Sequence, residues 1–300
     1  KTIPSTLNLK SIGDKMQAMV TRAIEIIRIH AHNPIPVAKL GYNQDAADTP
    51  DDMTTQGDIE AQAAYLEAIT ADPQFAGFGV IGEEGLNLPC AHPDMNIYFT
   101  CDPLDGTKAY DRKQAHGVGT MLALVCNGEV IAAFVGDINN GEIFRFVAGE
   151  GVTRHRFGIE EVLSLKIKPL AKQYVLFRER MSKHDPYIVE MAEADDSNKL
   201  FKDVEICGGS IGLHMARLWI GEVGATVLNQ QYVTPWDYMP VIGLSIALGF
   251  VFLDYEPTTG EFTEYTPDTF MDVRKVFRTT LIIHRENLPE LRAWLATHRK

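Results

Sequence analysis

The chain has 300 residues, 45% hydrophobic and 23% charged, so it can bury a substantial core and has the composition of an ordinary soluble globular protein. With 28 Lys and Arg against 40 Asp and Glu, its net charge of −12 disfavours binding to nucleic acid polymers or anionic membranes. The longest apolar stretch, Val241 to Leu253, is too short to span a bilayer.

Hydrophobic periodicity and turn residues predict a mixture of helices and strands in the first half of the chain. Apolar residues recur at three- and four-residue steps from Ile12 to Ile27, which is typical of an amphipathic helix, and a second helix is predicted over 58–70. Residues 33–51 are rich in Pro, Asp and Asn and indicate a connector. Strands are predicted at 77–81 and 97–101, and we expect Pro103 to end the second.

The clearest local signal is Asn127-Gly128 between two β-rich runs, 121–126 and 129–135. This pair suits a type I′ turn and predicts an antiparallel hairpin. A further turn at 139–141 leads into a third predicted strand over 142–148, so the sequence predicts a strand meander.

The pattern weakens around 158–172, and we place a domain boundary there. Residues 1–165 are expected to form an α+β domain with an antiparallel sheet, and residues 166–300 an α/β domain. In the second, strands are predicted at 174–177, 249–255 and 261–265, and helices at 187–194, 210–220, 237–248 and 288–297. Because there is no regular βαβ alternation, the fold class is α+β or layered α/β.

The four cysteines, Cys90, Cys101, Cys126 and Cys207, form no CxxC pair and no disulfide framework. No signal peptide is visible at the start of the sequence. These features predict reduced thiols and a cytoplasmic protein.

The motif Asp102-Pro-Leu-Asp105-Gly-Thr107 places two carboxylates three residues apart in a predicted strand-exit turn. Carboxylate oxygens suit a hard cation such as Mg²⁺. The Gly106 and Thr107 amides, at the predicted start of a helix, would face the same point and hold a phosphate. A metal site and a phosphate site at the same point indicate phosphoryl transfer. Taken alone, the motif fits equally well a capped turn with solvated aspartates.

Three other acidic positions have ordinary structural interpretations when each is considered alone. Glu83-Glu84 ends a predicted strand, but such a pair is usually solvated on a surface. Asp58, three residues after Thr55, fits the capping of a helix, and Asp237, after Trp236, fits an N-cap aspartate.

In combination, the acidic run at 82–84, the Asp-Pro-Leu-Asp-Gly-Thr motif at 102–107 and the later Trp236-Asp237 resemble the inositol monophosphatase superfamily of metal-dependent, lithium-sensitive phosphatases. The resemblance implies an αβαβα sandwich with alternating layers of helices and sheets, commonly a homodimer. It implies Mg²⁺-dependent hydrolysis of a small phosphorylated metabolite by direct attack of a metal-activated water. The implied substrates are an inositol monophosphate-like compound, a sugar phosphate or a 3′-phosphoadenosine nucleotide.

The resemblance also implies roles for individual residues. Glu83, Asp102 and the carbonyl of Leu104 would hold a first Mg²⁺. Asp102, Asp105 and Asp237 would hold a second, and Asp58 matches a position linked to a third, more weakly held ion. Glu83 and Thr107 would be catalytic by orienting the attacking water, and the substrate would be bound by Gly106, Thr107, Gly209, Ser210 and Gln230.

The sequence departs from the superfamily pattern at several positions. After Trp-Asp it continues Tyr238-Met239-Pro240-Val241, and we expect Pro240 in a first helical turn, where its missing N–H is tolerated. Gln230 stands where an acid is often found, which weakens the case for a plain polyol substrate. Lys108 is reminiscent of the branch that acts on 3′-phosphorylated adenosine nucleotides, although a lysine in a first turn is often merely solvated.

Two rival interpretations concern function. A haloacid-dehalogenase-type phosphatase also has aspartates before Gly-Thr, but there they lie two residues apart, which argues against it. A catalytically silent member acting as a binding or regulatory subunit stays open, and metal binding without turnover would favour it.

Overall fold

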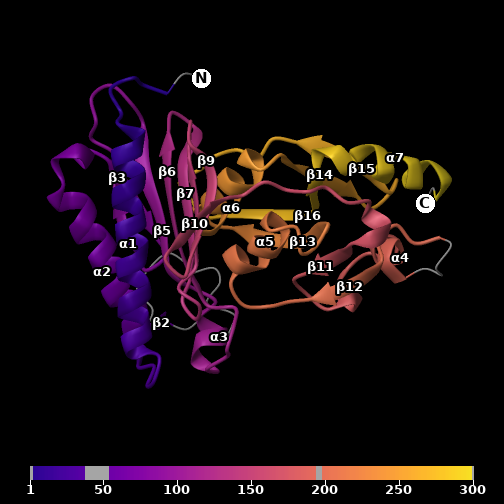
Figure 1. The fold of residues 1–300 in the computed structure, drawn as a ribbon, viewed down its shortest axis with the longest axis horizontal. Helices are drawn as coiled ribbons and strands as arrows, with labels where there is room; N and C mark the ends of the chain where they lie inside the picture. Colours follow the sequence, from indigo (N-terminus) through magenta and orange to yellow (C-terminus); the bar gives the residue numbers. More distant parts are fainter. Residues whose placement is uncertain (1–2, 38–53, 194–197, 299–300) are drawn as a thin grey trace.

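A computed structural model describes residues 3–37, 54–193 and 198–298, so most of the predicted connector lies outside the described residues (Figure 1). Two helices, α1 (Leu9–His30) and α2 (Gln56–Ala71), form the first layer. The apolar stripe of α1 is buried from Ile12 to Ile27, as its periodicity predicts. A two-stranded ribbon of β1 (Pro36–Val37) and β2 (Thr54–Thr55) precedes α2.

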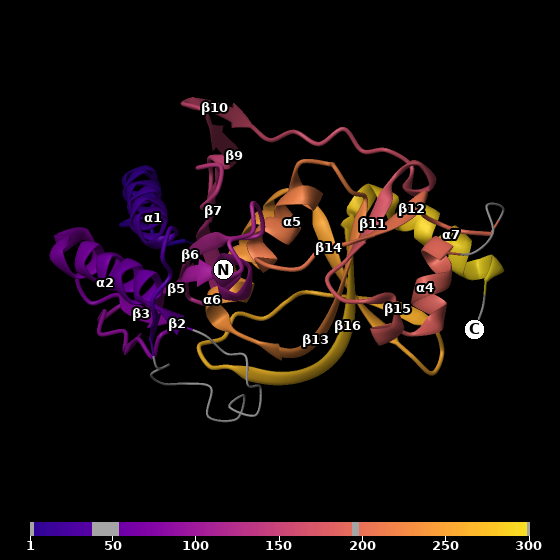
Figure 2. The same cartoon turned by 90° about the horizontal axis from the view of Figure 1, so that it is seen from below.

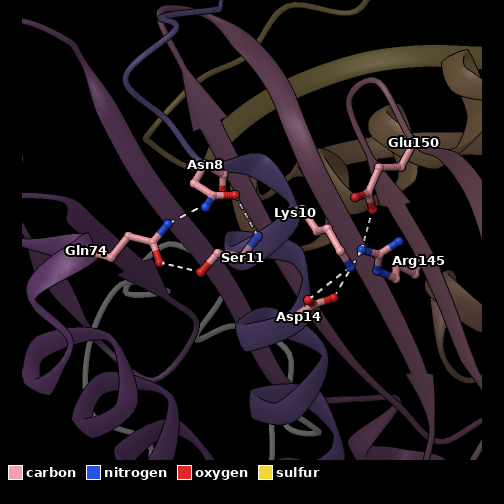
Figure 3. Close-up of polar contacts among 7 residues, drawn as sticks. All are labelled: Asn8, Lys10, Ser11, Asp14, Gln74, Arg145 and Glu150. Carbon is pink, nitrogen blue, oxygen red and sulfur yellow. Dashed lines mark hydrogen bonds and ion pairs between the residues drawn. The ribbon is translucent and has the colours of Figure 1, made fainter.

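Polar contacts tie the start of α1 to the segment that follows α2 (Figure 3). Asn8 caps the helix by accepting a hydrogen bond from Ser11 N over 3.1 Å. Ser11 Oγ in turn lies 2.9 Å from Oε1 of Gln74, in the 3-10 turn Pro73–Phe75. These contacts fix the position of one helix relative to the other.

The same helix is tied to the adjacent sheet by Arg145, which is buried on β8. Its guanidinium lies 2.5 Å from a carboxylate oxygen of Glu150 and 3.7 Å from one of Asp14 on α1 (Figure 3). Because the cation is buried between two carboxylates, its charge is compensated.

The second layer is an eight-stranded sheet in the order β10-β9-β8-β7-β6-β5-β3-β4. All of its pairings are antiparallel except β3 with β5. The predicted hairpin is confirmed, with φ of 51° at Asn127 and 82° at Gly128. The strands are β3 (Gly79–Gly82), β4 (Asn87–Leu88), β5 (Ile97–Asp105), β6 (Gly119–Cys126), β7 (Glu129–Asp137), β8 (Ile143–Val147), β9 (Gly151–Arg156) and β10 (Ile159–Val162).

Alternation along β6 explains why this sheet is covered on both faces. Leu122, Leu124 and Cys126 pack in the core with α1 and α2, whereas Met121, Ala123 and Val125 pack in the core with the next helical layer. Successive strand residues point to opposite faces, so a strand apolar at every position predicts a sheet between two layers.

The next layer consists of α5 (Ile211–Trp219) and α6 (Pro235–Ala247), which lie between the two sheets (Figure 2). The second sheet has six strands in the order β12-β11-β13-β16-β14-β15, with β11 parallel to both of its neighbours. The outer helices α4 (Pro186–Glu193) and α7 (Leu288–Thr297) cover its far face. The strands are β11 (Tyr174–Phe177), β12 (Asp203–Ile206), β13 (Ala225–Val233), β14 (Phe250–Glu256), β15 (Glu261–Tyr265) and β16 (Arg274–His284). The predicted αβαβα layering is confirmed.

Two expectations about proline are wrong. β5 does not end before Pro103 but continues to Asp105, because the ladder is irregular at that point. Pro240 does not lie in a first turn but well inside α6, which begins at Pro235. There it removes one helical hydrogen bond, a loss that the burial of its neighbours Met239 and Val241 helps to offset.

All four cysteines are free thiols, as predicted. Among the described residues, no helix has the length and apolar character needed to cross a membrane.

His214 on α5 gives the fold a testable pH dependence. It is buried, with Nε2 2.5 Å from Oγ1 of Thr226 on β13, and burial lowers its pKa to about 3. In the unfolded chain its pKa is about 6.5. The unfolded state therefore binds a proton that the folded state excludes, and stability present above about pH 6.5 is lost as the pH falls towards 3.

We expect His214 to contribute about 2 kcal/mol of destabilisation at pH 5 relative to pH 7.5. Chemical denaturation of the wild type and of His214→Gln at both pH values, without divalent cations, measures this, because other titrating groups are common to both proteins. An equal loss of stability in the two proteins would show that His214 does not couple folding to pH.

Candidate active site

The carboxyl end of β5 carries Asp102 and Asp105. Residues three apart on a regular strand point to opposite faces, so these carboxylates would diverge without a distortion. Asp102 pairs with Met121 and Asp105 with Gly119, so β5 contains one extra residue between the two pairs. Such a bulge tolerates Pro103, which has no N–H to donate, and turns both aspartates towards one point.

Asp237 reaches the same point from the second half of the chain. It lies in the first turn of α6, where Thr234 is the N-cap, so its interpretation as an N-cap aspartate is wrong. Thr234 Oγ1 donates to Asp237 Oδ2 over 2.7 Å and fixes that carboxylate. One oxygen each from Asp102, Asp105 and Asp237 lie within 4.8 Å of one another.

Three glycines allow the two halves of the chain to meet beside these aspartates. Gly106, Gly117 and Gly209 have φ of +92°, +79° and +87°. A Cβ on Gly106 would lie 2.3 Å from the carbonyl oxygen of Gly117, and one on Gly209 would lie 2.6 Å from the same oxygen. This close approach lets Ser210 N donate to Gly117 O over 2.9 Å and Ser210 Oγ donate to Asp105 Oδ2 over 2.5 Å.

The cluster combines burial with like charge. Asp102 and Asp105 are 3% and 5% exposed, and Asp237 is partly buried. Burial, followed by the charges of Glu83 and Asp237, raises the pKa of Asp102. Burial, followed by the charge of Asp237, raises the pKa of Asp105 to about 6. The pKa of Asp237 is raised by burial and then by Glu83.

None of the three clustered aspartates forms a salt bridge with a described residue, although the nearby charge of Arg178 lowers the pKa of Asp105 and Asp237. Buried carboxylates without a counter-charge are stable when they are protonated or when they bind a cation. The donor set, all oxygen, is the one that Mg²⁺ and Ca²⁺ prefer. The cluster therefore fits a hard divalent cation.

Glu83 lies directly after β3, beside the cluster. Its charge raises the pKa of both Asp102 and Asp237, so it lies close to the cluster. The next residue, Glu84, is buried and accepts a hydrogen bond from Thr54 Oγ1 over 2.9 Å. The interpretation of Glu83-Glu84 as a solvated surface pair is therefore wrong.

Asp58 is fully buried in the first turn of α2. Its Oδ2 accepts hydrogen bonds from Thr55 N and Thr55 Oγ1 over 2.8 and 2.5 Å, so the capping interpretation holds. Its Oδ1 is buried and has no partner among the described residues. Burial is the main cause that raises its pKa to about 7, and the charge of Glu83 adds to it. Asp58 thus caps a helix and still has one oxygen available near Glu83.

The turn after Asp102 holds a carbonyl and a hydroxyl in fixed positions. Leu104 N donates to Asp102 Oδ1 over 2.9 Å, and Thr107 Oγ1 donates to Leu104 O over 3.1 Å. Thr107 begins the short helix α3 (Thr107–Asp111), with Gly106 as its N-cap. Because α3 is about one turn long, its dipole is small, and any anion here would rely on the first amides, which have no acceptor within the helix.

A cavity of about 210 Å³ opens beside Asp237. Gln230 lines it and accepts a hydrogen bond from Thr280 Oγ1 over 3.2 Å. Arg178, the first residue after β11, lines the same cavity. Sequence reasoning does not single out Arg178; the available signal is its place at the carboxyl end of a predicted strand, the edge where α/β sheets bind ligands.

Comparisons with known proteins agree with this geometry. A sequence profile of the inositol monophosphatase family matches residues 10–298. The extragenic suppressor protein SuhB from Bartonella henselae is similar in structure, with 17% identity, a TM-score of 0.69 and coverage of 95% of this chain and 98% of that one. The inositol monophosphatase from Anabaena has 19% identity, a TM-score of 0.66 and coverage of 97% of both chains.

A third structure, Staphylococcus aureus inositol monophosphatase II, has 17% identity and a TM-score of 0.66, with coverage of 96% of this chain and 94% of that one. This protein has also been solved with 2′-AMP and with inositol monophosphate bound. No curated protein matches the sequence. The family profile spans nearly the whole chain, so the chain belongs to the inositol monophosphatase family and is a phosphatase.

Proposed function

We propose that the chain is a Mg²⁺-dependent hydrolase of a small phosphate monoester in which water attacks phosphorus directly. The observation that carries the proposal is the group of Asp102, Asp105 and Asp237, which bring one carboxylate oxygen each within 4.8 Å of one another. The experiment that tests it is a turnover assay on phosphate monoesters with and without Mg²⁺.

The residues around this group divide between two cations and a weaker third. Glu83, Asp102 and the Leu104 carbonyl would hold one, and Asp102, Asp105 and Asp237 a second. Asp58, with its unpartnered Oδ1, would serve a third. When bound, these ions would acidify a water molecule and neutralise charge on the phosphate oxygens.

Thr107 and Glu83 are the proposed groups that orient the attacking water. Thr107 Oγ1 donates a hydrogen bond to the Leu104 carbonyl, so its oxygen stays available to accept a hydrogen bond from water. The amides of Gly106 and Thr107 would hold phosphate oxygens.

The leaving group would lie on the Asp237 side, near Gly209, Ser210 and Gln230. Ser210 is held by Asp105, and Gln230 lines the cavity beside Asp237. Inositol monophosphate and 2′-AMP, bound by a relative of this fold, support a small phosphorylated metabolite. Inositol monophosphate-like compounds, sugar phosphates and 3′-phosphoadenosine nucleotides are the substrates to screen.

Removal of divalent cations should abolish phosphatase activity, and added Mg²⁺ should restore it, because the clustered carboxylates are proposed to hold the ions that acidify the attacking water. As the family membership suggests, lithium in the millimolar range should inhibit. Phosphate release is measured after exhaustive EDTA treatment and again after Mg²⁺ is returned. Full activity in the chelated enzyme would rule out the metal mechanism.

Asp237→Asn should lower turnover by at least about 100-fold, the scale of losing one positioned charge contact. It should not lower the melting temperature without metal, because it removes one of several buried like charges. Mg²⁺ should raise the melting temperature of the wild type by mass action and raise that of the variant less.

The matched control for this variant is Asp94→Asn, at an exposed aspartate outside the cluster. It should leave unchanged both the turnover and the rise in melting temperature that Mg²⁺ causes. Normal turnover and a normal Mg²⁺ shift in Asp237→Asn would contradict the assignment of Asp237 as a ligand.

Thr107→Ala should reduce turnover by about 10²–10³-fold with little change in KM, because the amide that holds phosphate remains while the hydroxyl is lost. Thr107→Ser keeps the hydroxyl and should retain much more activity. Steady-state kinetics on both variants test this. If Thr107 serves only the turn, both variants should show near-normal turnover, and Thr107→Ala should lose a little stability.

A further inference from the structure

Arg178 is a cation next to the phosphatase site with an unused hydrogen-bond donor. Among the described residues it forms no salt bridge, and its Nη1 is buried with no hydrogen-bond partner. A buried donor of a charged group that lacks an acceptor is costly, and native proteins rarely keep one without a reason. The missing partner of Arg178 therefore calls for an acceptor.

The position of Arg178 on the sheet directs it towards the site. β11 and β13 are parallel, so their carboxyl ends lie at the same edge, and Arg178 follows β11 there. Leu176 packs in the core between the two sheets, whereas Phe177 packs in the outer core. Continuing this alternation by one residue, Arg178 faces the layer of α5 and α6, in agreement with its place in the lining of the cavity beside Asp237.

The neighbours of Arg178 agree with this placement. Arg178 and Asp237 line the same cavity of about 210 Å³. The charge of Arg178 lowers the pKa of both Asp105 and Asp237, so it lies close to the cluster. Glu179, the nearest acid in sequence, acts instead on His184 and accepts no hydrogen bond from Arg178.

Bound cations repel an arginine beside a metal site unless an anion lies between the arginine and the cations, or next to the arginine. The scissile phosphate is one such anion, but the proposed phosphate donors are at Gly106 and Thr107, on the β5 side. Arg178 lies on the leaving-group side, in the cavity with Gln230. There Gln230 is neutral, so the wall of the cavity near Arg178 carries no acid other than Asp237 and Glu179.

We propose that Arg178 is a specificity-determining residue that binds an oxyanion on the leaving group, so that the preferred substrate is a phosphate ester whose alcohol carries a second phosphate or a carboxylate. This inference rests on the proposed function. A planar guanidinium matches both oxyanions with paired hydrogen bonds. A second cavity of about 290 Å³ shares Gln230 and Tyr238 with the first and is lined by Arg274, Arg278 and Asp268.

Matched pairs of phosphate esters test the proposal, each pair differing in one anionic group. They are glycerol 3-phosphate against 3-phosphoglycerate, inositol 1-phosphate against inositol 1,4-bisphosphate, and 2′-AMP against adenosine 2′,5′-bisphosphate. The wild type should show a higher kcat/KM for the second member of at least one pair. A preference in the first pair identifies a carboxylate, and a preference in the others identifies a phosphate.

Arg178→Gln should reduce the selectivity ratio of the preferred pair by about 10- to 100-fold, the scale of a charged hydrogen bond. Arg178→Lys should keep part of the ratio, because the charge remains without the planar fork. Arg180→Gln removes the same charge from an exposed position two residues away and should leave the ratio unchanged.

Three outcomes would overturn the proposal: a wild type without preference in any pair, an equal loss on both members in Arg178→Gln, or the same change of ratio in Arg180→Gln. An equal loss would place Arg178 on the scissile phosphate or in a structural role. No phosphate release from any of the esters with Mg²⁺ would contradict the proposed function itself, which separates the two failures.

Discussion

The burial of several carboxylates at one point is the constraint on which the rest of the site depends. Asp102, Asp105 and Asp237 would repel one another if they were ionised together, and burial raises the pKa of each. The fold tolerates this because Thr234 and Ser210 donate hydrogen bonds to two of them. Such a cluster is a poor way to stabilise a protein, but it is a suitable way to bind a small divalent cation.

To form the cluster, two parts of the chain that are distant in sequence must come so close that their backbones are in contact. The contact of Gly106 and Gly209 with the carbonyl of Gly117 makes this possible, because a side chain at either glycine would collide with that oxygen. The same contact places Ser210 on Asp105, and thereby links α5 to the end of β5. Gly106 and Gly209 therefore serve the packing between the two halves of the chain as well as the local turns.

Individual helices and strands could be predicted because their signals are local, whereas their αβαβα layering was implied by the family resemblance. The helix at Leu9–His30, the Asn127-Gly128 hairpin and the strand at Tyr174–Phe177 follow from periodicity and turn chemistry. The acidic motifs predicted the cluster only through the family resemblance. Hydrophobic periodicity gives no information about contacts between residues that are distant in sequence. The division of the chain near residue 165 and the roles of the individual site residues stay predictions.

Other features could not be predicted because they depend on tertiary context. Pro103 ends a strand in isolation, yet a bulge keeps it within β5. Pro240 lies inside α6 because the helix starts two residues before Asp237, at a proline that fits a first turn. The only sequence signal for Arg178 is its place at the carboxyl end of a predicted strand, and its importance comes from an unpartnered Nη1 and a neighbouring cavity.

The central claim is that the aspartate cluster binds divalent cations. Diffraction from crystals grown with Mn²⁺, whose anomalous scattering locates it, tests this most directly. In the wild type we expect strong anomalous peaks in contact with oxygens of Asp102, Asp105 and Asp237. In Asp237→Asn we expect the peaks at these positions to be lower than in the wild type, or absent. Fully occupied Mn²⁺ elsewhere, with no peak at the three aspartates, would contradict it.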